Sequence, residues 1–418
     1  MKITSLLFGI FAGCISLPLA CAADYTWNGG NASWTDSGAW LLDGNAADWV
    51  NGSNALFQTG STLAVGSGIS ASGLLYEGVA VTLNGGSLTL AGNASGSNGG
   101  SATLSGTALT LNAADAEDAW TVRDTSLSGS STLTKTGNGT VTLSGTHTAN
   151  GTWNINEGTL VFTGARDITA GGKINIASGA VLDASGGRLF HAANYASNWE
   201  QPTITLNGGT LKLNQFGYNS ASLGCLQNNF YALKFSSGTT SRVVISQGYE
   251  SGGTGSRGIY IAGWGTTAVI ELGANQTCTW SSANAQNFDS IVCESGAGSA
   301  LQLVVGENSV FNFDQKFANK NTANEYGAPT TSNFSGLSLI KSGSGELVVK
   351  RANTISSDRV VRVDAGKLTL DVDTAFGTGS VLGSVNIASG ALLSINGQTL
   401  NKTIKVVSGA TLNIECRS

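Results

Sequence analysis

Residue types that commonly perform catalysis are few in this 418-residue chain, and they do not form a recognisable constellation. Its two histidines, His147 and His191, lie outside any catalytic motif. Asp371 and Asp373 would share one face of a strand, where solvated pairs are common. The acidic cluster 115–118 lies between two alternating apolar stretches, which indicates a solvated corner, with a general acid–base pair as the alternative. We therefore expect no catalytic residues, no cofactor site, no metal site and no enzymatic activity.

A glycine-rich motif at Gly253–Gly258 matches the G-x-G-x-x-G pattern of dinucleotide-binding loops. That function requires a strand before the motif and a helix after it. The residues that follow, Ile259-Tyr260-Ile261, have the composition of a strand. The motif therefore indicates a glycine-rich turn.

Four of the six cysteines lie beyond the N-terminal segment, at Cys225, Cys278, Cys293 and Cys416, and four cysteines allow three complete pairings. Cys278 and Cys293 are the closest pair. If the chain is exported to an oxidising compartment, a bridge between them is expected to add about 3 kcal/mol of stability. Metal binding is the weaker alternative, because no paired C-x-x-C spacing is present. Mapping of peptides under non-reducing conditions would test the bridge.

Aromatic residues concentrate in two parts of the chain. The opening segment contains Trp27, Trp34, Trp40 and Trp49, which fit either a cap over the end of a repeat structure or a platform for sugars; we favour the cap. Between residues 187 and 330 many aromatic side chains occur where the repeat pattern loosens. These fit either a wider core or loops that bind a glycan by ring stacking. The candidate stacking residues there are Tyr195, Trp199, Tyr249 and Trp264.

A repeated unit organises the chain as a whole. Residues 133–164 contain a glycine followed by alternating apolar residues twice, beginning at Gly139 and at Gly158. The pattern Leu-x-Lys-x-Gly-x-Gly that opens this stretch returns 206 residues later, within 339–370. Alternation places the apolar side chains on one face of a strand, and the glycines suit tight turns. Successive units follow at steps of roughly 20 residues without helical patterning, which predicts a β-solenoid.

This unit resembles the autotransporter-associated β-strand repeat of bacterial surface passengers. The likeness is clearest at 133–164 and 339–370, and the tryptophan-rich opening also resembles the start of such proteins. The resemblance implies an all-β fold, a right-handed parallel β-helix with coils of about 20 residues. Complete members often carry a C-terminal outer-membrane β-barrel or a sorting tail, and the residues after Ile414 are too few for either.

Composition and the first residues suggest an exported protein. Residues 1–22 read as a signal peptide, with Lys2, an apolar run and a small-x-small cleavage site; lipidation at Cys14 or Cys21 is the alternative. Only 11% of residues are charged, and the net charge of -5 gives no basic surface for nucleic acid. No apolar run in the mature chain is long enough to span a bilayer.

The sequence therefore predicts five regions: a signal peptide (1–22), a tryptophan-rich cap (23–60), regular coils (61–186), irregular coils with long loops (187–330) and regular coils (331–418). We expect a bacterial cell-surface or extracellular scaffold with an adhesive or structural role. Its partner would be an extracellular glycan or a host surface, with a further partner at the C-terminal edge. The alternatives are a carbohydrate-binding protein that uses the loop aromatics and, less favoured, a polysaccharide-cleaving β-helix enzyme.

Overall fold

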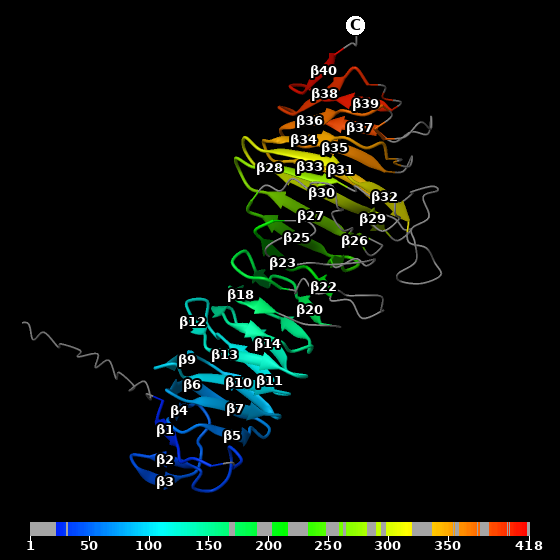
Figure 1. The fold of residues 1–418 in the computed structure, drawn as a ribbon. Coiled ribbons are helices and arrows are strands. Elements are labelled where there is room, and N and C mark those ends of the chain that lie inside the picture. Colours follow the sequence, from blue (N-terminus) through cyan, green and yellow to red (C-terminus); the bar gives the residue numbers. More distant parts are fainter. Residues whose placement is uncertain are drawn as a thin grey trace, which may run out of the picture.

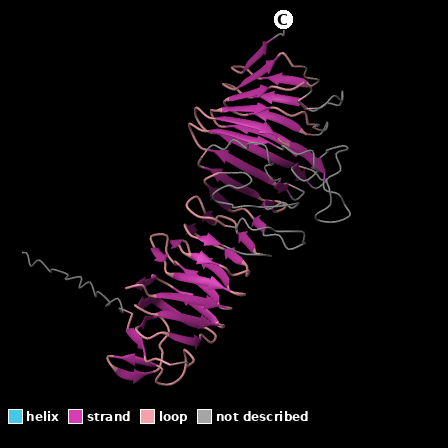
Figure 2. Ribbon diagram, in the orientation of Figure 1, coloured by secondary structure: helices cyan, strands magenta, loops and turns pink. Residues whose placement is uncertain are grey.

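The computed structural model consists of stacked strands joined by loops (Figure 1). It describes residues 22–30, 32–166, 172–189, 203–215, 233–247, 259–261, 265–281, 290–293, 298–319, 337–353, 355, 359–373, 375–376, 384–398, 400 and 402–415. Within these residues there are strands and loops but no α-helix (Figure 2). Nearly all strand pairs are parallel, so the predicted all-β parallel solenoid is confirmed.

The strands form three faces, which we call A, B and C in the order in which they follow one another along the chain within a coil. Face A continues from the first half of β6 (Ile69–Glu77) through β8 (Ser87–Leu90), β11 (Ala108–Asn112), β14 (Thr132–Thr136), β17 (Trp153–Ile155), β20 (Lys173–Ile176), β22 (Thr203–Leu206), β24 (Leu233–Phe235), β26 (Ile259–Ile261), β29 (Ser290–Cys293) and β32 (Lys316–Asn319).

Face B is the longest stack. It comprises β1 (Asp24–Trp27), β4 (Ser53–Phe57), β6 (Ile69–Glu77), β9 (Ala94–Ser97), β12 (Ala119–Val122), β15 (Thr140–Leu143), β18 (Thr159–Phe162), β21 (Val181–Asp183), β23 (Thr210–Leu213), β25 (Thr240–Ile245), β27 (Thr267–Leu272), β30 (Ser299–Val305), β33 (Leu337–Ser342), β35 (Val360–Val363), β37 (Ser384–Ile387) and β39 (Thr403–Val406).

Face C consists of three separate stacks. The first is β5 (Ser61–Ala64), β7 (Ala80–Asn84), β10 (Ser101–Ser105) and β13 (Thr125–Ser128), and the second is β16 (Thr146–His147) with β19 (Ala165–Arg166). The third is β28 (Thr277–Ser281), β31 (Val310–Asp314), β34 (Glu346–Val349), β36 (Lys367–Leu370), β38 (Leu392–Asn396) and β40 (Thr411–Glu415).

Alternation within each strand builds the core. In β15, Val141 and Leu143 are fully buried while the two threonines lie half-buried on the outside. Val141 lies opposite Leu160 in the next coil, which lies opposite Leu182 in the coil after that. Identical positions therefore stack along the solenoid about 4.8 Å apart, and each inward side chain packs against its neighbours above and below.

Coil length differs between the ends and the middle of the solenoid. Val141 and its partner Leu160 are 19 residues apart, and Leu393 and its partner Leu412 are also 19 residues apart. In the middle, Leu303 lies opposite Lys341, which is 38 residues later. The coils of about 20 residues thus occur at both ends, while longer connections enlarge the central ones, because the ladder constrains only the strands and leaves the loops free to grow.

Aromatic side chains close the N-terminal end. The strands β2 (Trp40–Leu42) and β3 (Asn45–Ala47) form an antiparallel hairpin against β1. Trp27, Trp34 and Trp40 are buried, and Trp27 and Trp40 meet edge to face with ring centroids 5.0 Å apart. Trp49 is partly buried against the same core. The three buried rings therefore have no open face for a sugar, and they cover the first coil.

The second stack of face C carries a buried polar cluster, formed by the inward side chains of His147 in β16 and Arg166 in β19. Arg166 donates a 2.7 Å hydrogen bond to the Gly151 carbonyl and lies over the Trp153 ring, 4.6 Å from its centroid. His147 is fully buried, and its Nδ1 accepts a hydrogen bond from the Leu127 N–H. Burial lowers the pKa of His147 from 6.5 to about 4, the Ser144 backbone opposes this change, and the Arg166 charge reinforces it.

This cluster should make the solenoid sensitive to acid. His147 stays neutral in the folded chain at pH values where the unfolded chain already binds a proton. The free energy of unfolding should therefore fall by about 3 kcal/mol as the pH drops from above 6.5 to about 4, because only the unfolded chain gains the proton on His147. Denaturant unfolding at pH 7 and pH 4.5 should show a smaller acid loss for His147→Gln than for the parent chain. An imidazole that titrates near 6.5 by NMR would contradict this expectation.

Candidate functional site

The residues singled out in the sequence give little direct information about a site. Tyr195, Trp199, Tyr249 and Trp264 all lie outside the described residues. Cys278 is fully buried in β28, while the side chain of Cys293 lies outside the described part of the chain. Stacking by these aromatics and the Cys278–Cys293 bridge therefore stay predictions.

The acidic residues lie on the surface. Asp115 and Glu117 are exposed, and the Asp118 carboxylate accepts a hydrogen bond from the Asp115 N–H, closing a local turn. Asp371 and Asp373 are exposed as well. Among the described residues, no group of three or more His, Cys, Asp or Glu side chains is arranged to hold a metal ion. The same residues include no helix with the length and apolarity needed to cross a bilayer.

The lysine of the repeat forms a structural site inside the solenoid. Lys135 is fully buried, and its ammonium donates to the carbonyls of Thr136 (2.8 Å), Gly137 (2.7 Å) and Glu157 (3.3 Å). The first carbonyl belongs to the last residue of β14, the second to the corner that follows it, and the third lies in the next coil. The ammonium therefore joins two coils at a corner by charge-assisted hydrogen bonds.

The second copy of the repeat has the same geometry. Lys341 is fully buried, and its ammonium donates to the carbonyls of Ser342 (2.8 Å), Gly343 (2.7 Å) and Ala365 (3.0 Å). Burial lowers the pKa of Lys341 from 10.5 to about 8. Burial also lowers the pKa of Lys135, where the charge of the nearby Glu157 opposes the change.

The two copies occupy different corners of the solenoid. Lys135 lies in β14 on face A, and the strand that follows its corner, β15, lies on face B. Lys341 lies in β33 on face B, and the following strand, β34, lies on face C. The repeat is therefore a corner unit: two strands that are consecutive in the chain lie on different faces and meet at the corner. This unit occurs at more than one edge of the three-sided coil.

No role for these lysines is predicted above from the sequence, although the repeat pattern contains the signal. Lys135 is two residues after Leu133, so the period of two places both side chains on the inward face. A buried lysine must find partners for its charge, and the carbonyls of a glycine-rich corner are the nearest acceptors.

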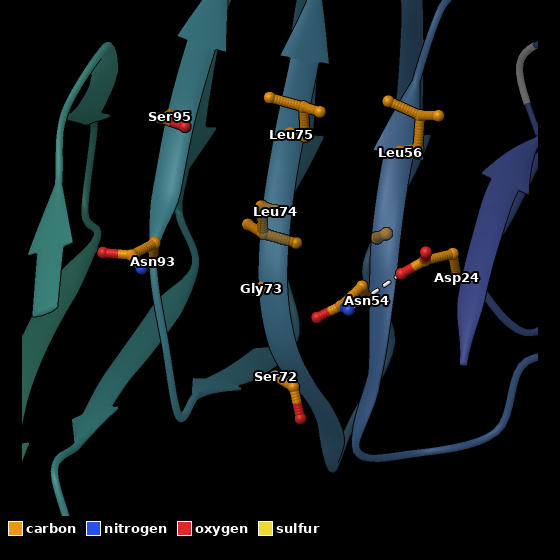
Figure 3. A pocket seen from close by; sticks show the side chains of 10 residues that line it. Asp24, Asn54, Leu56, Ser72, Gly73, Leu74, Leu75, Asn93 and Ser95 are labelled. Carbon is orange, nitrogen blue, oxygen red and sulfur yellow. Dashed lines mark hydrogen bonds between the residues drawn. The ribbon is translucent and has the colours of Figure 1, made fainter. Parts of the chain in front are cut away.

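An external groove provides a second candidate site, on face B near the N-terminal end. It has a volume of about 370 Å³ and lies over β1, β4, β6, β9 and the turn before β9. Its lining residues are Asp24, Asn54, Ala55, Leu56, Ser72, Gly73, Leu74, Leu75, Asn93 and Ser95. Figure 3 shows this groove.

A β-bulge shapes the groove. Ser53 lies opposite Ala71, but Asn54 lies opposite Gly73, so Ser72 is an extra residue in β6. The strand β6 pairs with β8 before this point and with β9 after it. The bulge therefore lies where the chain turns from face A to face B. Bulges bend a strand locally and change the direction of nearby side chains.

Hydrogen bonds fix the polar side chains around the groove. Asn54 Nδ2 donates to Asp24 Oδ1 at 2.8 Å, and Asn93 Oδ1 accepts from the Thr121 N–H at 2.9 Å. Gly73 lies between these two asparagines, and a Cβ there would be 3.0 Å from Asn54 Oδ1. Glycine thus leaves the floor of the groove open. These residues come from separate coils and follow no motif, so no sequence signal could have identified them.

A second hollow of about 370 Å³ lies farther along the solenoid. It is lined mainly by amide and hydroxyl side chains from β20, β22 and the corners that follow β17, β22 and β24, including Asn156, Asn175, Thr205 and Asn207. Asn175 Nδ2 donates to Asn154 Oδ1 at 2.8 Å. This hollow has no exposed leucine wall like that of the first groove.

The C-terminal coil exposes apolar side chains. Val406, Val407, Leu412 and Ile414, from β39, β40 and the turn between them, are between 36% and 60% exposed. A partner at this edge, as expected from the sequence, stays a prediction.

Comparison with known proteins finds similarity to autotransporter sequences. Residues 133–162 match the family model described as the passenger-associated-transport-repeat. The chain is also 28% identical over 395 residues to the adhesin BmaC autotransporter of Brucella suis biovar 1 (strain 1330). That alignment covers 91% of this chain but only 10% of the relative, so the chain spans about a tenth of the length of the curated relative it matches. No solved structure matches the chain.

Proposed function

We propose that this autotransporter-associated repeat protein is an exported bacterial scaffold that acts in adhesion at the cell surface or in the extracellular space. The observation that carries the proposal is the similarity to an autotransporter adhesin along 91% of the chain. The signal-peptide pattern of residues 1–22 supports export. The scaffold would hold binding surfaces at fixed positions along its length.

The surface of the first regular coils is consistent with this role. Residues 78–114 contain no charged side chain, and their outward positions are mostly hydroxyls, amides and small residues. The threonines Thr62, Thr82 and Thr103 form one outward ladder on face C. Such a surface offers no counterion release for nucleic-acid binding, which depends on Lys and Arg. It can instead form many neutral hydrogen bonds with a partner.

The test is an adhesion assay with the mature chain, residues 23–418. Beads that carry the chain are incubated with mucin-coated, matrix-coated and polysaccharide-coated surfaces, and reducing sugar ends released into the medium are measured in the same wells. Retention of the beads without sugar release is the expected result. Beads that are not retained on any surface would overturn the adhesive role, and release of reducing ends would instead favour an enzyme.

A further inference from the structure

We infer that the groove over β4, β6 and β9 is a subsite for an uncharged sugar ring of a glycan. This inference rests on the proposed adhesive function and names the ligand class that such a surface would bind. Its evidence is the arrangement of hydrogen-bonding groups around Gly73, the leucines beside them and the charge of the lining.

The hydrogen-bonding groups match neighbouring hydroxyls of a sugar. Because Asn54 Nδ2 donates to Asp24, the Oδ1 of Asn54 is directed toward Gly73, where it can accept a hydrogen bond (Figure 3). Because Asn93 Oδ1 accepts from the Thr121 N–H, its NH2 group is the end available to donate. An acceptor and a donor therefore flank the open floor. Sugar hydroxyls both donate and accept, so a pair of adjacent hydroxyls can satisfy both groups.

The leucines supply an apolar wall next to these polar groups. Leu56 and Leu75 lie side by side on β4 and β6, two residues beyond Asn54 and Gly73 respectively (Figure 3). Leu75 is 39% exposed, and Leu56 is half-buried. A sugar ring has C–H groups on one face and hydroxyls at its edge. It can therefore cover the leucines while its hydroxyls reach the asparagines, in the mixed lining that small-molecule sites use.

The charge of the groove selects against other ligands. Among the residues that the structure describes, Asp24 is the only charged one in the lining, so an anionic sugar would meet repulsion without a compensating cation. A divalent cation would find a single carboxylate, fewer than such ions require. An extended peptide could not add as a strand, because β4 and the second half of β6 already have ladder partners on both sides.

Glycan binding can be measured directly. The mature chain is titrated against uncharged oligosaccharides ending in glucose, galactose, mannose or N-acetylglucosamine, and against sialylated and uronic-acid counterparts. Two variants alter the groove: Leu75→Arg fills it, and Asn54→Ala removes its acceptor. Thr62→Arg is the matched control, because Thr62 is an exposed outward residue on β5 of face C. Circular dichroism confirms the fold of each variant.

The expected result is binding of at least one uncharged glycan, weakened tenfold or more by Leu75→Arg and by Asn54→Ala but not by Thr62→Arg. Equal binding by the parent chain and the folded groove variants would overturn the inference. Binding of anionic glycans alone, or of none, would overturn it as well.

The bead assay separates this inference from the proposed function. Beads that adhere equally well with and without Leu75→Arg would leave the adhesive function intact and refute the groove as its contact. If the soluble chain binds a neutral glycan through the groove while the beads adhere to no surface, the glycan site stands and the adhesive function fails.

Discussion

Replacing Gly137 with alanine should destabilise the solenoid by roughly 3 kcal/mol or more. Gly137 has a φ of +74°, and a Cβ there would overlap the Ala113 carbonyl oxygen in the preceding coil. The Cβ would also be 2.5 Å from the carbonyl carbon of Ala113 and 2.8 Å from the Cα of Ala114. These are backbone atoms within a hydrogen-bonded stack, so they cannot rotate away as a flexible side chain could.

Gly179→Ala is the matched control, because it changes the same residue type at the same backbone angle without the overlap. Gly179 has a φ of +75°, and a Cβ there would meet nothing within 4 Å. Its replacement should cost only about 1 to 2 kcal/mol, the penalty for a left-handed conformation. Denaturant unfolding, together with hydrogen exchange around the altered corner, measures both variants. Equal losses of stability in the two variants would show that the overlap with the preceding coil adds nothing to the cost of Gly137→Ala.

Replacing Lys341 with methionine should cost about 3 kcal/mol, because three charge-assisted hydrogen bonds to carbonyls are lost from the interior. Methionine keeps most of the side-chain volume, so the loss reports on the ammonium more than on packing. Lys173→Met is the control: Lys173 is an exposed lysine on β20, and its replacement should change stability by less than about 0.5 kcal/mol.

The pH dependence of this variant gives a second readout. The pKa of Lys341 is about 8 in the folded chain and 10.5 in the unfolded chain. Between these values the unfolded chain binds more protons, so the stability of the parent chain should rise with pH across this window. Lys341→Met should show a smaller rise, because it keeps only the contribution of other buried lysines such as Lys135. Parallel curves for the two proteins from pH 8 to pH 10.5 would contradict a shifted lysine at this corner.

The repeat pattern was sufficient to predict the class of fold. Apolar residues alternate within each strand, and the units recur at roughly 20 residues. Because the apolar face of each short strand must be buried by neighbouring coils, this pattern is compatible with few folds other than a stack of coils. Val141 and Leu160 are ladder partners in adjacent coils, and both are buried on the inward face as that pattern requires. The position of Lys135 among inward residues was also present in the pattern, although its three carbonyl partners were not.

The stacking of the strands follows from the amino-acid pattern alone, because alternating side chains and glycine corners act within a few residues of one another. The corner that each repeat occupies depends on the tertiary fold, since Lys135 joins faces A and B while Lys341 joins faces B and C. The tertiary fold also determines that Asn54, Gly73 and Asn93, each about 20 residues from the next, surround one groove. The reason is that a β-bulge and the register between coils bring them together, and both depend on contacts across the stack.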